Sequence, residues 1–146
     1  MTVAAHTVAS VARRVTSDYL GLTTGERFVI VVDTRTDREI PEALAAAASE
    51  LGAEAAVVTI EPLARSGAEP PSDAALAMRT ADAVLCAAST SLYHTTAKAE
   101  AQRAGARGDF NAPYRADAWR NQDRDHRRDL GGAAARPTAV ASATCS

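Results

Sequence analysis

With 146 residues and a formal net charge of −2, the chain is long enough for one hydrophobic core but has no basic surplus that would indicate a nucleic-acid or membrane-surface partner. Hydrophobic residues make up 47% and aromatic residues only 4%, so small aliphatic side chains must build most of the core. No apolar run reaches the roughly 18 residues of a membrane-spanning helix. The cysteines, Cys86 and Cys145, lie far apart and suggest neither a disulfide framework nor a metal site. Because the N-terminal segment does not resemble a signal peptide, we expect a cytoplasmic protein.

The first half of the sequence predicts one helix and then a strand–helix–strand unit. Residues 6–20 carry apolar side chains at the three- and four-residue spacing of one helix face. Residues 27–34 form a continuous run rich in β-branched side chains, which is typical of a strand buried on both faces. A second helix is expected from Pro41, a favoured first helical residue, to the position before Gly52. Residues 53–60 then form the second strand.

The alternation of predicted helices and strands continues in the second half of the sequence. A loop rich in Pro and Gly at residues 61–71 precedes Ser72, a good N-cap for a helix over residues 73–80. A third strand is expected at residues 83–88 and a further helix at residues 92–104. Apolar strands that alternate with helices indicate a parallel sheet with right-handed crossovers. The predicted fold class is α/β, a Rossmann-like three-layer half-domain with a parallel sheet of three to four strands and an irregular C-terminal tail.

The alternating pattern breaks near Gly108. A fourth strand is due after Gly105, but no apolar run follows it. From Asp109 onwards the chain has arginines and aspartates but neither lysine nor glutamate, and its apolar residues show no period. We therefore predict an α/β N-terminal domain over residues 1–108 and a low-order tail over residues 109–146. The tail is either a genuine disordered segment or the product of translation out of frame.

The segment between the third strand and the following helix carries the best candidates for chemistry. Ser89, Thr90 and Ser91 follow the apolar strand, where a parallel sheet meets its ligands. They are candidates for the lining of a substrate cleft, where they would hold an anion or carboxylate, or for helix caps, and the two roles are compatible. With Ser91 as the cap, His94 lies in the first helical turn, where the dipole favours a neutral imidazole. His94 is the candidate catalytic residue, a base or a hydrogen-bond donor; otherwise it is a surface histidine.

Other chemical motifs are missing from the sequence. It has no dinucleotide fingerprint, no phosphate-binding P-loop and no nucleophile elbow. Its histidines lack the spacing of a metal site, so we expect no metal or other cofactor in this chain. Asp33, at the end of the first strand, is either a site carboxylate or the start of a polar loop. Cys86, inside an apolar strand, is interpreted as a small buried hydrophobic residue.

Three short motifs in a characteristic order resemble a known family. They are the E-P-P of Glu69 to Pro71, the A-D-x-V-L of Ala81 to Leu85 and the S-T-S-L-x-H-T of Ser89 to Thr95. Together with the strands and helices around them, over residues 15–107, they resemble the N-terminal domain of the M29-type metallo-aminopeptidases, the leucyl aminopeptidase and aminopeptidase T-like group. The likeness is greatest to the branch that includes the 2,5-dihydroxypyridine ring-cleaving dioxygenases.

The resemblance implies an α/β N-terminal domain that lines one side of a cleft, with His94 as a contributor to it. The family's divalent metal is held by His, Glu and Asp residues of a larger C-terminal domain, and none of those ligands has a counterpart here. Small-molecule or peptide substrates are expected only for the full-length relative.

Three functions follow as hypotheses. The first is a truncated N-terminal domain of a metal-dependent aminopeptidase-like hydrolase, inactive alone. The second is the corresponding domain of a ring-cleaving dihydroxypyridine dioxygenase. The third is a stand-alone, non-catalytic α/β binding module. Because the expected loss of a strand would expose a sheet edge, we also expect self-association.

Overall fold

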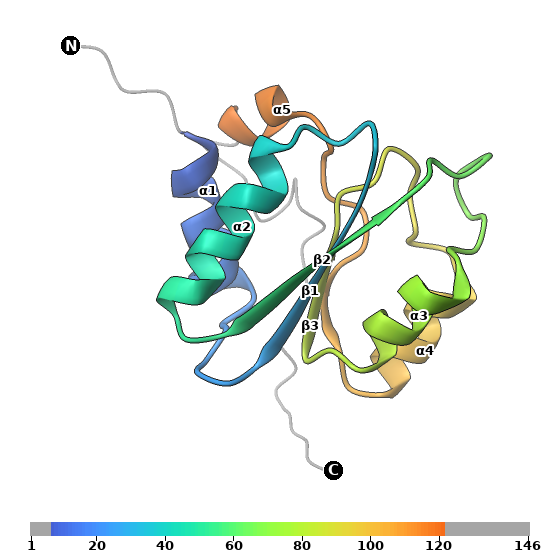
Figure 1. Ribbon diagram of the computed structural model, residues 1–146, viewed down its shortest axis with the longest axis horizontal. Coiled ribbons are helices and arrows are strands. Elements are labelled where there is room, and N and C mark those ends of the chain that lie inside the picture. Colours follow the sequence, from blue (N-terminus) through green and yellow to red (C-terminus); the bar gives the residue numbers. More distant parts are fainter. Residues whose placement is uncertain (1–6, 122–146) are drawn as a thin grey trace.

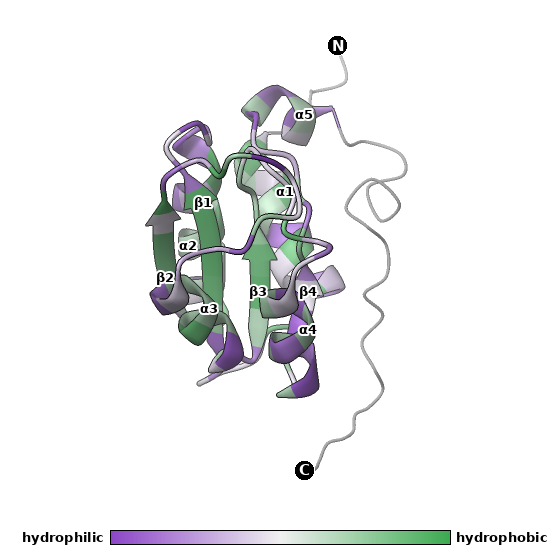
Figure 2. Cartoon of the chain, turned by 90° about the vertical axis from the view of Figure 1, so that its right-hand side faces the viewer, coloured by the Kyte–Doolittle hydropathy of each residue, from purple (hydrophilic) through white to green (hydrophobic). Residues whose placement is uncertain are grey.

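The computed structural model describes residues 7–121, which form a three-layer fold with one parallel sheet between two layers of helices (Figure 1). The four strands are β1 (Arg27–Asp33), β2 (Glu54–Ile60), β3 (Ala83–Cys86) and β4 (Arg107–Asp109). They lie in the order β2-β1-β3-β4, and every neighbouring pair is parallel. The α/β fold class is therefore confirmed. Figure 2 shows the strands side by side, with β1 and β3 coloured as hydrophobic along their length.

Helices cover both faces of the sheet, and each face has its own hydrophobic cluster. One face is covered by α1 (Val8–Arg14), its continuation η1 (Val15–Tyr19), α2 (Glu39–Glu50) and α5 (Ala116–Arg120). The other is covered by α3 (Ser72–Arg79) and α4 (Thr96–Arg103). Within residues 7–121, no helix is long and apolar enough to cross a membrane.

The predicted first helix exists, but its second half is wound more loosely than an α-helix. Thr7 caps α1 through a reciprocal pair of hydrogen bonds with Ser10. From Val15 the chain continues as the π-helical turn η1. The Thr16 hydroxyl donates to the Ala12 carbonyl at 2.9 Å and so competes for an acceptor that the regular helix would use.

The prediction that no fourth strand follows Gly105 is wrong. β4 pairs with β3, and a Cβ atom at Gly108 would lie only 1.8 Å from the carbonyl oxygen of Val84. Only glycine allows this close approach, so the residue that ended the apolar pattern is the one that permits the pairing. The Arg107 guanidinium fixes the strand by a bidentate pair with Glu26, at 2.7 and 3.1 Å, and donates to the Leu20 carbonyl.

The expected change to a low-order tail at Asp109 is also wrong as far as residue 121. Phe110 packs into the cluster on the α3–α4 face, and Trp119 is completely buried on the opposite face. The indole N–H of Trp119 donates to the Pro113 carbonyl at 2.7 Å. Asp37 accepts the Ala116 N–H at 2.7 Å and so caps α5. Residues 122–146 lie outside the described part of the chain, and the out-of-frame alternative stays a prediction about the gene.

Candidate functional site

The carboxyl ends of β1 and β3 are joined by a buried carboxylate. Chain connections leave β1 towards β2 on one side and return to β3 on the other, so this is the topological switch point at which α/β proteins commonly bind ligands. Oδ2 of Asp33 accepts both the N–H of Ser89, at 2.7 Å, and its hydroxyl, at 2.6 Å. Oδ1 accepts the Arg35 N–H at 2.9 Å. The Thr36 hydroxyl completes the link by donating to the Ala87 carbonyl at 2.7 Å.

These hydrogen bonds keep Asp33 ionised. Its burial acts to raise the pKa of the carboxyl, but the bonds from Ser89, Arg35 and Thr36 outweigh that effect and hold the pKa below its usual range. The donors that the sequence suggested for an external anion are thus present at Ser89, and the carboxylate of Asp33 occupies them. Asp33 is neither a free site carboxylate nor the start of a solvated loop.

The other two hydroxyls of the Ser/Thr cluster differ from each other. The hydroxyl of Ser91 accepts the Tyr93 N–H at 3.1 Å, and its own N–H donates to the hydroxyl of Ser66. The hydroxyl of Thr90 is buried without a hydrogen-bond partner. Among the three residues, Thr90 alone therefore retains a buried polar atom with unused hydrogen-bonding capacity.

Helix α4 begins later than the sequence predicts. Thr95, and not Ser91, is its N-cap, and accepts the Lys98 N–H at 3.1 Å. The carboxylate of Glu69 accepts the N–H groups of the first two residues of the helix, Thr96 at 2.7 Å and Ala97 at 3.1 Å. The Glu69 of the E-P-P motif is thus a helix cap, which the positive N-terminal end of α4 favours.

His94 lies in the exposed turn just before α4. Its ring meets the ring of Tyr93 edge-on, with centroids 4.9 Å apart. The ammonium of Lys98 lies 3.7 Å from the centroid of the Tyr93 ring and 5.9 Å from that of Phe110. We call Tyr93, His94 and Lys98 the aromatic–cationic cluster. It presents an imidazole, a phenol and an ammonium to solvent at the carboxyl edge of the sheet, a combination suited to a planar, anionic or hydroxylated ligand.

A second buried carboxyl group ends β4. Asp109 is almost fully buried, its Oδ1 accepts the Asn111 N–H at 2.9 Å, and its Oδ2 has no partner. Burial raises the pKa of Asp109 to about 7, against the smaller opposing effect of the Asn111 bond. Burial also raises the pKa of the neighbouring Cys86 thiol, to which the charge of Asp109 adds. Cys86 is therefore inert and hydrophobic, as the sequence indicated, while Cys145 lies outside the described residues.

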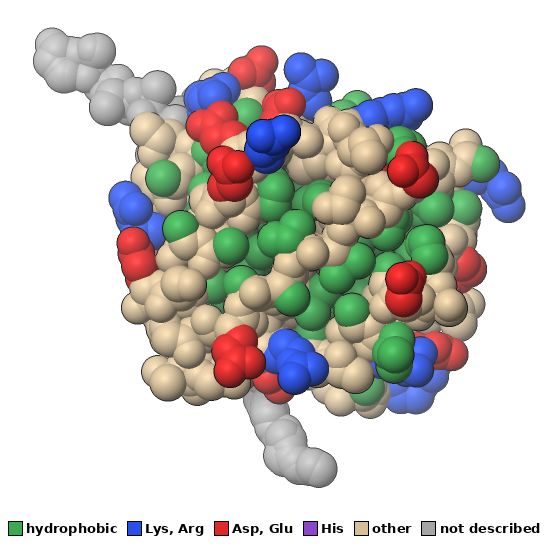
Figure 3. Space-filling view, in the orientation of Figure 1, with side chains coloured by type: hydrophobic (Ala, Val, Ile, Leu, Met, Phe, Trp, Pro, Cys, Tyr) green, Lys and Arg blue, Asp and Glu red, His purple; other side chains and the backbone are tan. Residues whose placement is uncertain are grey.

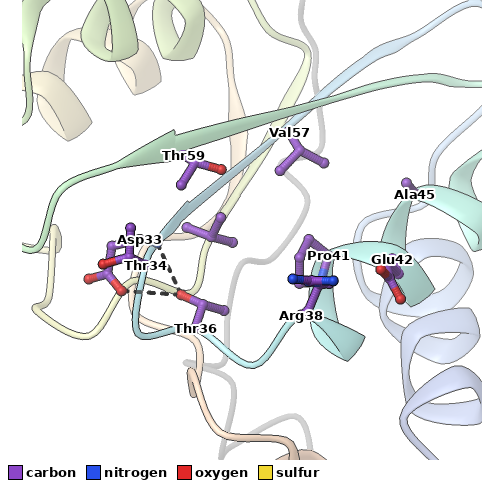
Figure 4. Close-up of a pocket in the computed structure, with 10 residues that line it drawn as sticks. Asp33, Thr34, Thr36, Arg38, Pro41, Glu42, Ala45, Val57 and Thr59 are labelled. Carbon is purple, nitrogen blue, oxygen red and sulfur yellow. Dashed lines mark hydrogen bonds between the residues drawn. The ribbon is translucent and has the colours of Figure 1, made fainter.

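A pocket of about 530 Å³ opens between α2 and the outer strand β2 (Figure 4). Its walls are mainly apolar, with three threonines and three charged residues, Asp33, Arg38 and Glu42, among the lining. The lining residues are Val32, Asp33, Thr34, Thr36, Arg38, Pro41, Glu42, Ala45, Val57 and Thr59. None of the residues that the sequence singled out between Ser89 and His94 reaches it.

The sequence pattern found His94 but missed its neighbours. Tyr93 directly precedes His94, and Lys98 is the single lysine of the chain, yet nothing in the spacing shows that its ammonium lies over the tyrosine ring. Asp109 was missed although it ends a strand, as Asp33 does. Among residues 7–121, no three His, Cys, Asp or Glu side chains are grouped closely enough to hold a metal ion.

No protein-family profile matches the chain, and no curated protein matches it. The solved structure of a 2,5-dihydroxypyridine dioxygenase from Pseudomonas putida KT2440 is similar, with a TM-score of 0.60 and 15% sequence identity over 69% of this chain. The match covers 32% of the dioxygenase, so the chain spans well under half of its length. At this identity the similarity establishes a shared fold. It agrees with the dioxygenase branch of the sequence resemblance, and none of these comparisons points to an aminopeptidase.

Proposed function

We propose that this chain forms the substrate-facing wall of an enzyme of the dihydroxypyridine dioxygenase type and acts together with a separate metal-bearing part. The observation that carries the proposal is the fold shared with about one third of that dioxygenase, since the match covers 32% of it. The aromatic–cationic cluster supports it, because the exposed Tyr93 and His94 and the half-buried Lys98 lie at the carboxyl edge of the sheet, where α/β proteins meet their ligands.

The cluster suits a dihydroxypyridine. Such a ring is planar, so the edge of the Tyr93 ring and the face of a bound ring can contact each other. The Lys98 ammonium attracts a hydroxyl oxygen that carries negative charge, and the exposed imidazole of His94 can donate a hydrogen bond to such an oxygen or accept one from a hydroxyl. In this proposal these residues bind and orient the substrate.

The residues described here do not fit the metal that the family resemblance implies. No group of three suitable ligands occurs among residues 7–121, so we assign this part of the chain to substrate binding alone. The aminopeptidase-like hydrolase and the stand-alone binding module are the two competing functions. The proposed function and its two competitors each predict a different ligand at the same edge of the sheet. Ligand binding can therefore distinguish the three functions.

A ligand titration followed by NMR of the ¹⁵N-labelled chain tests the proposal. The ligands are 2,5-dihydroxypyridine, titrated under anaerobic conditions, leucinamide and inorganic phosphate. We expect dihydroxypyridine to shift the amide signals of Tyr93, His94 and Lys98, and His94→Gln and Lys98→Gln each to weaken the response. Glu50→Gln, an exposed change at the far end of α2, is the matched control and should leave the response unchanged.

The other outcomes decide against the proposal. Shifts with leucinamide alone would favour the hydrolase, and shifts with phosphate alone would favour a non-catalytic binding module. No shift in the cluster with any of the three ligands would remove the substrate-binding role of this edge.

A further inference from the structure

The outer edge of β2 is open and almost free of charge. β2 ends the sheet, and no other strand of residues 7–121 pairs with its outer side. Its sequence, EAAVVTI, contains no lysine, no proline and one charged residue, Glu54, at its first position. Native proteins usually protect exposed edges with charges, prolines or bulges, because an open strand pairs readily with another chain. This edge lacks those protections.

The surface on either side of the edge is apolar as well. Figure 3 shows hydrophobic side chains gathered over β2 between α2 and α3, with charged side chains mainly around the rim. Val57, at the middle of β2, has 45% of its surface exposed, and Leu76 on α3 has 50%. The pocket between α2 and β2 lies on the same side. An apolar surface that spans a strand edge and both flanking helices is typical of an interface.

We propose that this face pairs with the same face of a second copy of the chain, so that two β2 strands meet antiparallel about a two-fold axis at Val57. The register follows from the backbone. The N–H of Glu54 bonds to the Glu26 carbonyl and therefore points towards β1. Since backbone groups alternate in direction along a strand, those of Ala55, Val57 and Thr59 point to the open side.

A two-fold axis at Val57 uses all of these free groups. Val57 lies opposite Val57 of the second copy, and Ala55 lies opposite Thr59. Each pair consists of residues that point outwards, so each is a hydrogen-bonded pair that exchanges two N–H···O bonds. No like charges face each other across the strands, because the one charged residue, Glu54, lies opposite Ile60.

The area of this face is close to what a standard dimer interface buries on each partner. Seven residues at about 3.3 Å each give an edge roughly 23 Å long. A sheet with a helix of about 10 Å diameter on each face is roughly 30 Å wide. The product, on the order of 700 Å², approaches the ~800 Å² per partner of a standard interface. The assembly stops at two copies, because each copy uses its one open β2 edge in the pairing.

The test is the oligomeric state of the full chain by sedimentation velocity over a dilution series. We expect a dimer that dissociates on dilution. Val57→Lys should raise the dissociation constant by about 100-fold or more, because two like charges would face each other at the axis. The exposed position of Val57 leaves the fold of the single chain intact. Ala99→Lys, which adds the same charge at an exposed site on α4, is the control and should still dimerise.

A backbone variant and amide exchange make the test specific. Thr59→Pro removes an N–H that points away from β1, so the single chain should fold while the dimer is lost. The amides of Ala55, Val57 and Thr59 should exchange slowly in the dimer and rapidly in Val57→Lys. A monomer at all concentrations, an open-ended aggregate, or a dimer that survives both variants would overturn the proposal. Slow exchange of these amides in a monomer would overturn it too, because the chain would then cover its own edge.

Discussion

The carboxyl group of Asp109 provides a direct test of the packing beyond residue 108. Burial raises the pKa of Asp109 to about 7 in the folded chain, whereas its ordinary value is 3.8. The folded state therefore binds this proton more tightly than the unfolded state does. Its contribution to stability is complete below the unfolded pKa and is lost as the pH rises through the folded pKa. The free energy of unfolding should fall between about pH 4 and pH 7 because of this group.

The size of the effect follows from the shift. A rise from 3.8 to about 7 is roughly three pKa units, and at about 1.4 kcal/mol per unit it corresponds to about 4 kcal/mol. Asp109→Asn keeps an oxygen that can accept the Asn111 N–H but does not ionise. The variant should match the parent protein near pH 4 and exceed its stability by up to about 4 kcal/mol above pH 7.

Urea unfolding at a series of pH values measures this difference. The single tryptophan, Trp119, is fully buried and reports unfolding by fluorescence. Asp117→Asn is the control, since it makes the same substitution at a side chain that is 87% exposed. A stability difference between Asp109→Asn and the parent that stays constant from pH 4 to above pH 7 would contradict this prediction, because it would mean that the carboxyl is solvated.

Three further substitutions test particular contacts. Ser89→Ala removes one bond to the ionised carboxyl of Asp33 and should cost about 1.5–3 kcal/mol in urea unfolding, with a rise in the pKa of Asp33 by NMR titration; an unchanged Asp33 pKa would contradict the link. Trp119→Ala should cost about 3–5 kcal/mol, followed by circular dichroism, and a loss below 1 kcal/mol would show that α5 does not dock. Gly108→Ala should lower the thermal unfolding midpoint sharply, since its Cβ would meet the Val84 carbonyl; a near-normal midpoint would argue against the β3–β4 pairing.

The sequence alone determined the parts of the fold that depend on local patterns. Apolar runs at residues 27–34, 53–60 and 83–88 predicted β1, β2 and β3, and the alternation with helices predicted a parallel sheet in a three-layer fold, which the structure confirms. It also identified the segment from Ser89 to His94 as the carboxyl edge of the sheet. The central strands β1 and β3 were predictable because a strand buried on both faces must be apolar along its length, and that requirement can be seen in a short window of sequence.

Tertiary structure decided what depends on single contacts between distant residues. β4 has three residues and forms because Gly108 lets two backbones approach, and α5 docks through one aromatic anchor, Trp119, so neither leaves a periodic signal. The donors of Ser89 hold Asp33, which lies 56 positions earlier in the chain. The open edge of β2 is likewise a property of the strand order. Local periodicity reports which side chains must be buried, and only the assembled fold determines which partners they meet.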